Sequence, residues 1–341
     1  MPVVDRREFG GRFSVSENAK RLSNYRYLEI QLMEMIGGWS HTTPQLAFKA
    51  TFGYHVYDHA RNADLLAERL QQLRSGRERE DPANSDFARL CEHVWNLRST
   101  VDRLVAVYRV LEPHLVSTYV YHADATDPLA DTPTVRLLHQ LAGTDQSHIA
   151  WGQAVLDSLT QDPEERKRAL VVQADLEERL VACGGVTGQG IESHWLAFAS
   201  AGEHARPAAR RNPGNTVYRF TKRCETVEHP VVEEPFWFSG EPADHASRYV
   251  DDASLDGFRS RFHQLLYGEV ETTDRMGKML AEFPELPWEM RLELAHQMWD
   301  EARHIEIVAK VVEDELGGEL GYARGRWCGG GCRTRTTRSG A

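Results

Sequence analysis

The sequence contains Glu301-Ala302-Arg303-His304, and Glu269 stands 32 residues before this stretch. Residues i and i+3 of an α-helix lie on one face, so a carboxylate and an imidazole at this spacing can reach one metal ion. Asp145-Gln146-Ser147-His148 repeats the pattern, and Glu112 stands 33 residues before Asp145. Two helix pairs that each carry a Glu and an acid-x-x-His predict a two-metal site inside a helix bundle.

A third copy of the pattern stands near the start of the chain, with different residues at the ligand positions. Glu29 is followed by His59-Ala60-Arg61-Asn62, so a His replaces the acid and an Asn replaces the His. The stretches 57–64 and 299–306 still share an aromatic residue, an Asp, an Ala, an Arg and a final acid at matching places. The first and third copies therefore look related beyond their ligands.

The similarity of these two copies extends to the helix before each motif. Gly37 falls opposite Gly277, and Glu34 falls opposite Asp274. We interpret the two copies as an internal duplication in which the first copy has lost ligand chemistry. Asp58, one residue before the ligand position, is either a carboxylate that orients a ligand histidine or a solvated acid of a charged helix.

Composition and charge exclude several classes of protein. The net charge of −11 argues against binding to nucleic-acid phosphates as the main activity. No run of about eighteen apolar residues is present, and the first eleven residues are polar, so neither a membrane span nor a secretion signal is predicted. The five cysteines are scattered and odd in number, which favours a reducing cytoplasm without disulfides.

Apolar residues at helical spacing predict an all-α fold. Thr-Pro pairs at 43–44 and 132–133 indicate helix starts, and Gly-Gly pairs at 37–38 and 317–318 indicate helix ends. Pro113, directly after Glu112, removes a backbone hydrogen bond and should kink its helix. The expected helices cover approximately residues 23–39, 43–73, 86–122, 132–159, 164–183, 254–283 and 287–316.

The order of these helices predicts four segments. Residues 1–160 form a four-helix part with the first two helix pairs, and residues 251–320 form the third pair, which completes the metal site. Residues 161–250 are an irregular connector or lid, with short strands or a loop at 217–220 and 231–232. Residues 321–341 read as a disordered basic tail or as the product of a shifted reading frame.

The chain resembles the ferritin-like di-iron carboxylate proteins, on the strength of Glu112, Asp145-x-x-His148, Glu269 and Glu301-x-x-His304. This resemblance covers most of residues 20–160 and 250–318. It implies a ferritin-like bundle that binds two iron ions, or a manganese and an iron ion. Asp145 departs from the family, which usually has the longer Glu at this position.

Within that superfamily, the chain is similar to the non-haem di-iron oxygenases of specialised metabolism. The resemblance implies a cytoplasmic enzyme that uses O2 to oxidise a small organic substrate, by nitrogen oxidation of the azoxy type or by C–H hydroxylation. Its partners would be an electron-donor protein or another reductant and, in one reading, a second copy of the chain. The alternative is a ferritin-like protein that binds metal without catalysis or is purely structural.

The sequence leaves open which two helix pairs form the site. Adjacency along the chain favours the first and second pairs, because sequential helices are often neighbours in space. Ligand chemistry favours the second and third pairs, because these supply four carboxylates and two histidines and because Asn62 is a poor iron ligand. We expect the second arrangement, with the ligands Glu112, Asp145, His148, Glu269, Glu301 and His304, and with Glu29 and His59 as weaker candidates.

Overall fold

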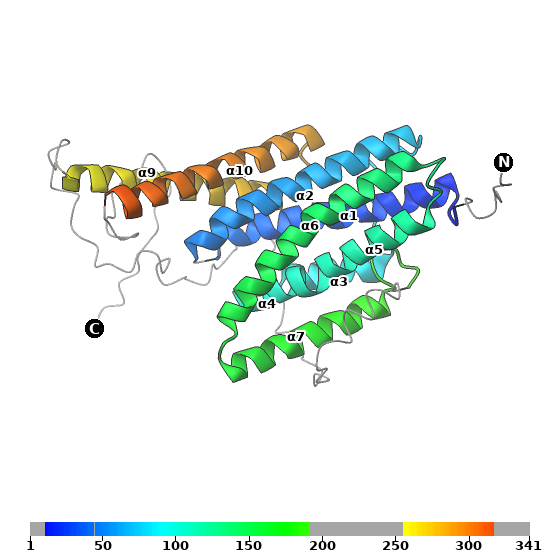
Figure 1. The fold of residues 1–341 in the computed structure, drawn as a ribbon, viewed down its shortest axis with the longest axis horizontal. Helices are drawn as coiled ribbons and strands as arrows, with labels where there is room; N and C mark the ends of the chain where they lie inside the picture. Colours follow the sequence, from blue (N-terminus) through cyan, green and yellow to red (C-terminus); the bar gives the residue numbers. More distant parts are fainter. Residues whose placement is uncertain (1–10, 44, 191–254, 317–341) are drawn as a thin grey trace, which may run out of the picture.

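The computed structural model describes residues 11–43, 45–190 and 255–316, and its regular structure in these ranges is entirely helical (Figure 1). The strands expected at 217–220 and 231–232 and the tail 321–341 lie outside the described residues. The elements are α1 (Val15–Ser40), α2 (Leu46–Gln72), α3 (Ser85–Trp95), α4 (Thr100–Val105), η1 (Ala106–Leu111), α5 (Glu112–Ala125), α6 (Thr132–Leu159), α7 (Pro163–Ala182), α9 (Leu255–Glu282), α10 (Trp288–Lys310) and η4 (Val311–Glu315).

The expected all-α fold is confirmed for these residues, with one correction. The single helix expected from residue 86 to 122 is broken at 96–99, where the Ser99 side chain accepts a hydrogen bond from the Asp102 backbone and caps α4. A π-helical turn, η1, then precedes Pro113. A wider turn accommodates a residue that cannot donate a backbone hydrogen bond, so the proline perturbs the helix where we expected it to.

The helices are arranged around a central antiparallel pair, α1 and α2 (Figure 1). Helices α5 and α6 lie on one side of this pair, and α9 and α10 pack on the other side, α9 against α1 and α10 against α2. Helix α7 covers η1 and α4. In the described ranges, no helix is long and apolar enough to cross a membrane.

Small residues let α9 and α10 approach the central pair closely. A Cβ atom on Gly37 would lie 3.3 Å from the Cα atom of Gly277, and a Cβ atom on Gly277 would overlap the Gly37 carbonyl. A Cβ atom on Gly53 of α2 would lie 2.8 Å from the carbonyl oxygen of Met298 in α10. Glycine at these positions is therefore required by the short distance between the helix backbones.

Two buried ion pairs cross between the helix pairs. Lys49 Nζ of α2 lies 2.6 Å from an Asp274 carboxylate oxygen of α9, and Arg291 of α10 pairs with Glu34 of α1. Lys49 and Arg291 are equivalent residues of the two copies, because each stands nine residues before the equivalent acid, Asp58 or Asp300. Glu34 and Asp274 are also equivalent, so each ion pair joins the basic residue of one copy to the acid of the other.

This exchange is the contact pattern of a two-fold axis, in which residue i meets j and j meets i. Gly37 meets its equivalent Gly277 at this axis, and the rings of the equivalent residues Tyr57 and Trp299 lie 5.4 Å apart. The first and third helix pairs are thus related by an approximate two-fold axis, which supports the interpretation of an internal duplication.

The Lys49–Asp274 pair yields a stability prediction. Lys49→Met should lower the free energy of unfolding by about 3 kcal/mol, because it leaves the Asp274 charge unpaired in a mostly buried position. Urea unfolding followed by circular dichroism measures the change. Lys20→Met, the same substitution at an exposed site of α1, should change stability by less than about 0.5 kcal/mol. Equal effects from the two variants would contradict a role for the buried pair.

A buried polar network ties the start of α1 to α5 and α6. Asn18 Nδ2 donates to Asp131 Oδ2 at 2.9 Å, and this fixes the amide so that its oxygen faces His122 Nε2, also at 2.9 Å. His122 Nε2 therefore donates, and the ring is neutral. Its Nδ1 atom is buried without a hydrogen-bond partner among the described residues, and burial lowers the pKa of His122 to about 3.

The low pKa of His122 predicts acid sensitivity. The folded state takes up a proton at His122 only at a lower pH than the unfolded state does. The contribution of neutral His122 to the free energy of unfolding is therefore fully present above about pH 6.5 and is lost as the pH drops toward 3. The contribution lost between pH 7 and 5 is about 2 kcal/mol. His122→Gln should flatten the pH dependence of the unfolding free energy, whereas His139→Gln, at an exposed site of α6, should leave it unchanged. Parallel curves for all three proteins would refute the prediction.

Candidate metal centre

Four helices bring one group of ligand-type side chains together in the interior. Helix α1 supplies an acid, α2 a histidine and an amide, α5 an acid, and α6 an acid and a histidine. Each of these side chains is almost completely buried: Glu29, His59, Asn62, Glu112, Asp145 and His148. This is the arrangement that adjacency along the chain favours, formed by the first and second helix pairs.

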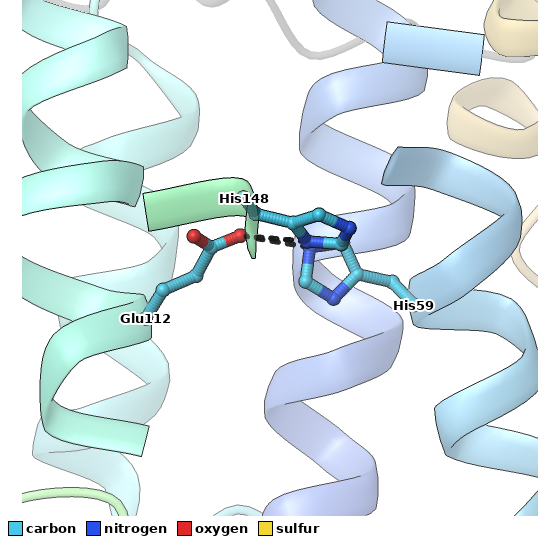
Figure 2. Close-up of side chains that lie close together, drawn as sticks. All are labelled: His59, Glu112 and His148. Atoms are coloured by element: carbon cyan, nitrogen blue, oxygen red, sulfur yellow. Dashed lines mark hydrogen bonds and ion pairs between the residues drawn. The ribbon is translucent and has the colours of Figure 1, made fainter. Parts of the chain in front are cut away.

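The first group of potential ligands consists of His59, Glu112 and His148 (Figure 2). One ligand atom from each lies within 4.8 Å of the others. Figure 2 shows both imidazole rings beside one carboxylate oxygen of Glu112. His59 Nε2 lies 3.1 Å from Glu112 Oε1, and His148 Nδ1 lies 3.5 Å from the same oxygen. Two histidines and one carboxylate are the ligand set of many non-haem iron sites.

A second group shares His59 with the first and adds Glu29 and Asp145. His59 Nδ1 lies 2.6 Å from Glu29 Oε2, so the two ring nitrogens of this histidine face carboxylates of different groups. Asn62 Nδ2 donates to Glu29 Oε1 and to Asp145 Oδ1, each at 3.0 Å. The Tyr119 hydroxyl also donates a hydrogen bond to Glu29 Oε1, at 2.6 Å.

His148 is connected to the surface through Asp58. The Asp58 Oδ2 atom lies 3.0 Å from His148 Nε2, and the Asp58 side chain is 44% exposed. This contact turns Nδ1 of His148 toward Glu112, as expected of a carboxylate that orients a ligand histidine. The equivalent acid of the third pair, Asp300, lies 3.1 Å from Arg303 and 3.8 Å from Nε2 of His304, so it contacts a histidine of its own helix, whereas Asp58 contacts a histidine of another helix.

Three buried atoms of the centre lack a hydrogen-bond partner among the described residues: Glu112 Oε2, Asp145 Oδ2 and His148 Nδ1. Leaving such atoms unpaired in the interior costs free energy, and each is an atom that can bind a metal ion. All three belong to the second helix pair, whose ligand motif is intact. The residues present therefore fit a cation in this part of the centre.

The pKa values show how the metal-free centre balances its charges. Burial lowers the pKa of His59, but the carboxylates of Glu29 and Glu112 outweigh this and raise it well above its ordinary value. Burial likewise lowers the pKa of His148, but its contact with Asp58 and the nearby carboxylate of Glu112 raise it to about 9. Burial, and then the Glu29 charge, raise the pKa of Asp145. These shifts all favour added positive charge at the centre.

The structure does not place the third helix pair at this centre, where we expected it to complete the site. Glu269, Glu301 and His304 form a separate group whose ligand atoms lie within 4.8 Å of one another. The reason is the close packing described above, which holds α9 and α10 on the far side of α1 and α2 from α5 and α6 (Figure 1). The structure thus joins Glu112, Asp145 and His148 to Glu29 and His59 instead.

The separate group is more exposed than the buried centre. His304 Nδ1 lies 3.0 Å from Glu301 Oε2 and 3.4 Å from Glu269 Oε2, and the His304 side chain is 43% exposed. Burial and the neighbouring carboxyl group of Glu301 raise the pKa of Glu269 to about 7. Gln297 Nε2 donates to the remaining Glu301 oxygen at 2.7 Å.

Sequence reasoning missed the aromatic surroundings of the buried centre. His55 stacks on His148 with ring centroids 3.9 Å apart, and His55 Nδ1 bonds the hydroxyl of Tyr108 at 2.7 Å. Trp151 meets the rings of both His55 and Tyr108 edge to face. Each of these residues stands three or four positions from a candidate ligand and so lies on the same helix face. This spacing in the sequence could have identified them as neighbours of the centre.

Comparison with known proteins adds no assignment. No family model matches the chain, and neither the curated proteins nor the solved structures contain a significant match.

Proposed function

We propose that this protein is an iron-dependent enzyme that uses O2 to oxidise a small organic molecule. The buried group of His59, Glu112 and His148 carries this proposal, because two histidines and one carboxylate with further positions open are typical of non-haem iron oxygenases. The bound iron would supply the O2 chemistry that amino-acid side chains lack. Nitrogen oxidation and C–H hydroxylation are both compatible with such a centre.

The surrounding residues have distinct tasks in this proposal. Asp58 holds the His148 ring in place and offers a route for protons between His148 and solvent, since its side chain is half-exposed. Glu29 fixes the His59 ring through Nδ1, and Tyr119 and Asn62 hold Glu29 in turn. Burial of the ligands keeps bulk water out, which strengthens each electrostatic contact at the centre.

The number of iron ions follows from the use of His59. One ion held by His59, Glu112 and His148 leaves Glu29 and Asp145 as hydrogen-bonding neighbours. Two ions, as the family resemblance implies, require the second group as well, and His59 would then serve both through its two nitrogens. Because the Asn62 amide donates to both Glu29 and Asp145, where a second ion would have to bind, we favour one iron ion per chain at this centre.

The proposal is tested by adding Fe(II) without air and then mixing the protein with O2. We expect O2 uptake well above that of the same amount of free iron, with about one iron per chain bound in the interior. Glu112→Gln, which keeps the side-chain volume and removes the charge, should reduce uptake to the level of free iron. Glu177→Gln, at a buried acid of α7, is the matched control and should retain full uptake.

A purely structural role is the second candidate, and one observation favours it. His59 bonds carboxylates on both sides, and its raised pKa lets an imidazolium neutralise them without a metal. In that case the protein would bind no iron in its interior, and O2 uptake would equal that of free iron in the wild type. The same experiment therefore separates the two functions.

A further inference from the structure

The third helix pair carries half of a metal site on its outer face. Glu269 of α9 and Glu301 and His304 of α10 form a complete Glu and Glu-x-x-His set, with ligand atoms within 4.8 Å of one another. The His304 side chain is 43% exposed, so the set opens toward the surface. Three protein ligands from one helix pair are half of the inventory that two pairs provide in a helix bundle.

The approximate two-fold axis shows what such a face packs against. On the first pair, the equivalent residues Glu29 and His59 are covered by α5 and α6, which bring Glu112 and Asp145-x-x-His148. The described ranges contain no further helix pair with a Glu and an acid-x-x-His that could cover the third pair in the same way. The face most suited to pair with this set is another copy of the set itself.

Apolar side chains flank the half-site. Most of the exposed large apolar residues in the described parts of the chain lie on α9 and α10. Leu255, Phe258 and Leu265 are 41–52% exposed, and with Glu269 they recur at intervals of three, seven and four residues. This spacing places them along one side of α9, beside the ligand set, where an exposed apolar stripe marks an interaction surface.

We propose that two copies of this chain join through α9 and α10 and together hold two divalent metal ions. A two-fold contact is self-complementary, so each copy contributes Glu269, Glu301 and His304 to one shared site. The joined site has four carboxylates and two histidines, and four negative charges balance two divalent cations. The apolar stripes of the two α9 helices would cover each other. This site is separate from the buried centre and does not depend on it.

Light scattering after size-exclusion chromatography, with Mn(II) or with EDTA, tests the proposal. We expect twice the mass of one chain with Mn(II) and the mass of one chain with EDTA. His304→Ala should abolish the Mn(II)-dependent dimer, and this half-exposed residue can be removed without disturbing the core. Leu265→Asp should abolish it as well, since it places charge in the apolar stripe without touching a ligand.

Two controls keep this result apart from the buried centre. His148→Ala should lose the buried metal and keep the Mn(II)-dependent dimer, and His139→Ala, at an exposed site of α6, should change neither. A wild-type protein that keeps the mass of one chain at saturating Mn(II) would overturn the proposal. So would a dimer that His304→Ala leaves intact, or His304-dependent Mn(II) binding by a monomer, which would indicate that another part of the same chain completes the site.

Discussion

Replacing His148 by alanine should remove iron from the buried centre and abolish O2 uptake above that of free iron. His148 is one of three residues in the His59, Glu112 and His148 group, and its Nδ1 atom is buried without a hydrogen-bond partner in the described structure. Loss of a residue that only orients a ligand costs about 10- to 100-fold in metal affinity. Loss of the ligand itself should therefore cost at least about 100-fold. Equilibrium dialysis against Fe(II), followed by iron analysis, measures this change.

Two variants make this result specific. His139→Ala removes an exposed histidine of the same helix and should retain full iron content. His304→Ala should leave the buried iron unchanged, because His304 lies in the separate group on α10. If His304→Ala empties the centre and His148→Ala does not, the third helix pair holds the iron and the assignment to α5 and α6 is wrong. Circular dichroism of each variant shows whether the fold is retained.

Replacing Gly277 by alanine should lower the free energy of unfolding by about 2 kcal/mol, the usual cost of overpacking a tight interior. The added Cβ atom would overlap the carbonyl oxygen of Gly37, which is backbone and cannot turn away. Helices α1 and α9 must therefore move apart, and the crossed ion pairs beside this contact would weaken with them. Urea unfolding measures the loss.

The same substitution at Gly143 should have the opposite effect on the free energy of unfolding. Gly143 lies in the interior of α6, and a Cβ atom there would meet nothing within 4 Å. Gly143→Ala should therefore stabilise the protein by roughly 0.5–1 kcal/mol, because alanine favours the helix more than glycine does. If Gly277→Ala also stabilises the protein, α1 and α9 do not pack as closely as the structure indicates.

The helices and the ligand motif of the second pair were predictable from local rules. Helix α6 begins and ends where the Thr-Pro start and the apolar period indicated, and Glu112 meets His148 because α5 and α6 are adjacent in the fold. Spacing along one helix determines which side chains share a face. These parts of the site depend only on short-range sequence.

The partner of the second pair could not be predicted in this way, because it depends on packing between distant helices. Ligand inventory favoured the third pair, yet α9 and α10 pack against α1 and α2 through Gly37, Gly277 and Gly53. The matching of Gly37 with Gly277, and of Glu34 with Asp274, was visible in the sequence. We interpret this match as a trace of duplication, and in the structure the same residues also form or flank the contact between the copies.

The most direct test of the central claim is the position of iron in crystals, located by anomalous diffraction at the iron absorption edge. We predict a strong peak between His59, Glu112 and His148, enclosed by α2, α5 and α6. A weaker peak beside Glu29 and Asp145 would indicate a second ion in the same centre and would agree with the claim. Crystals with bound iron that show no peak among these buried residues, or a peak only beside His304, would contradict it.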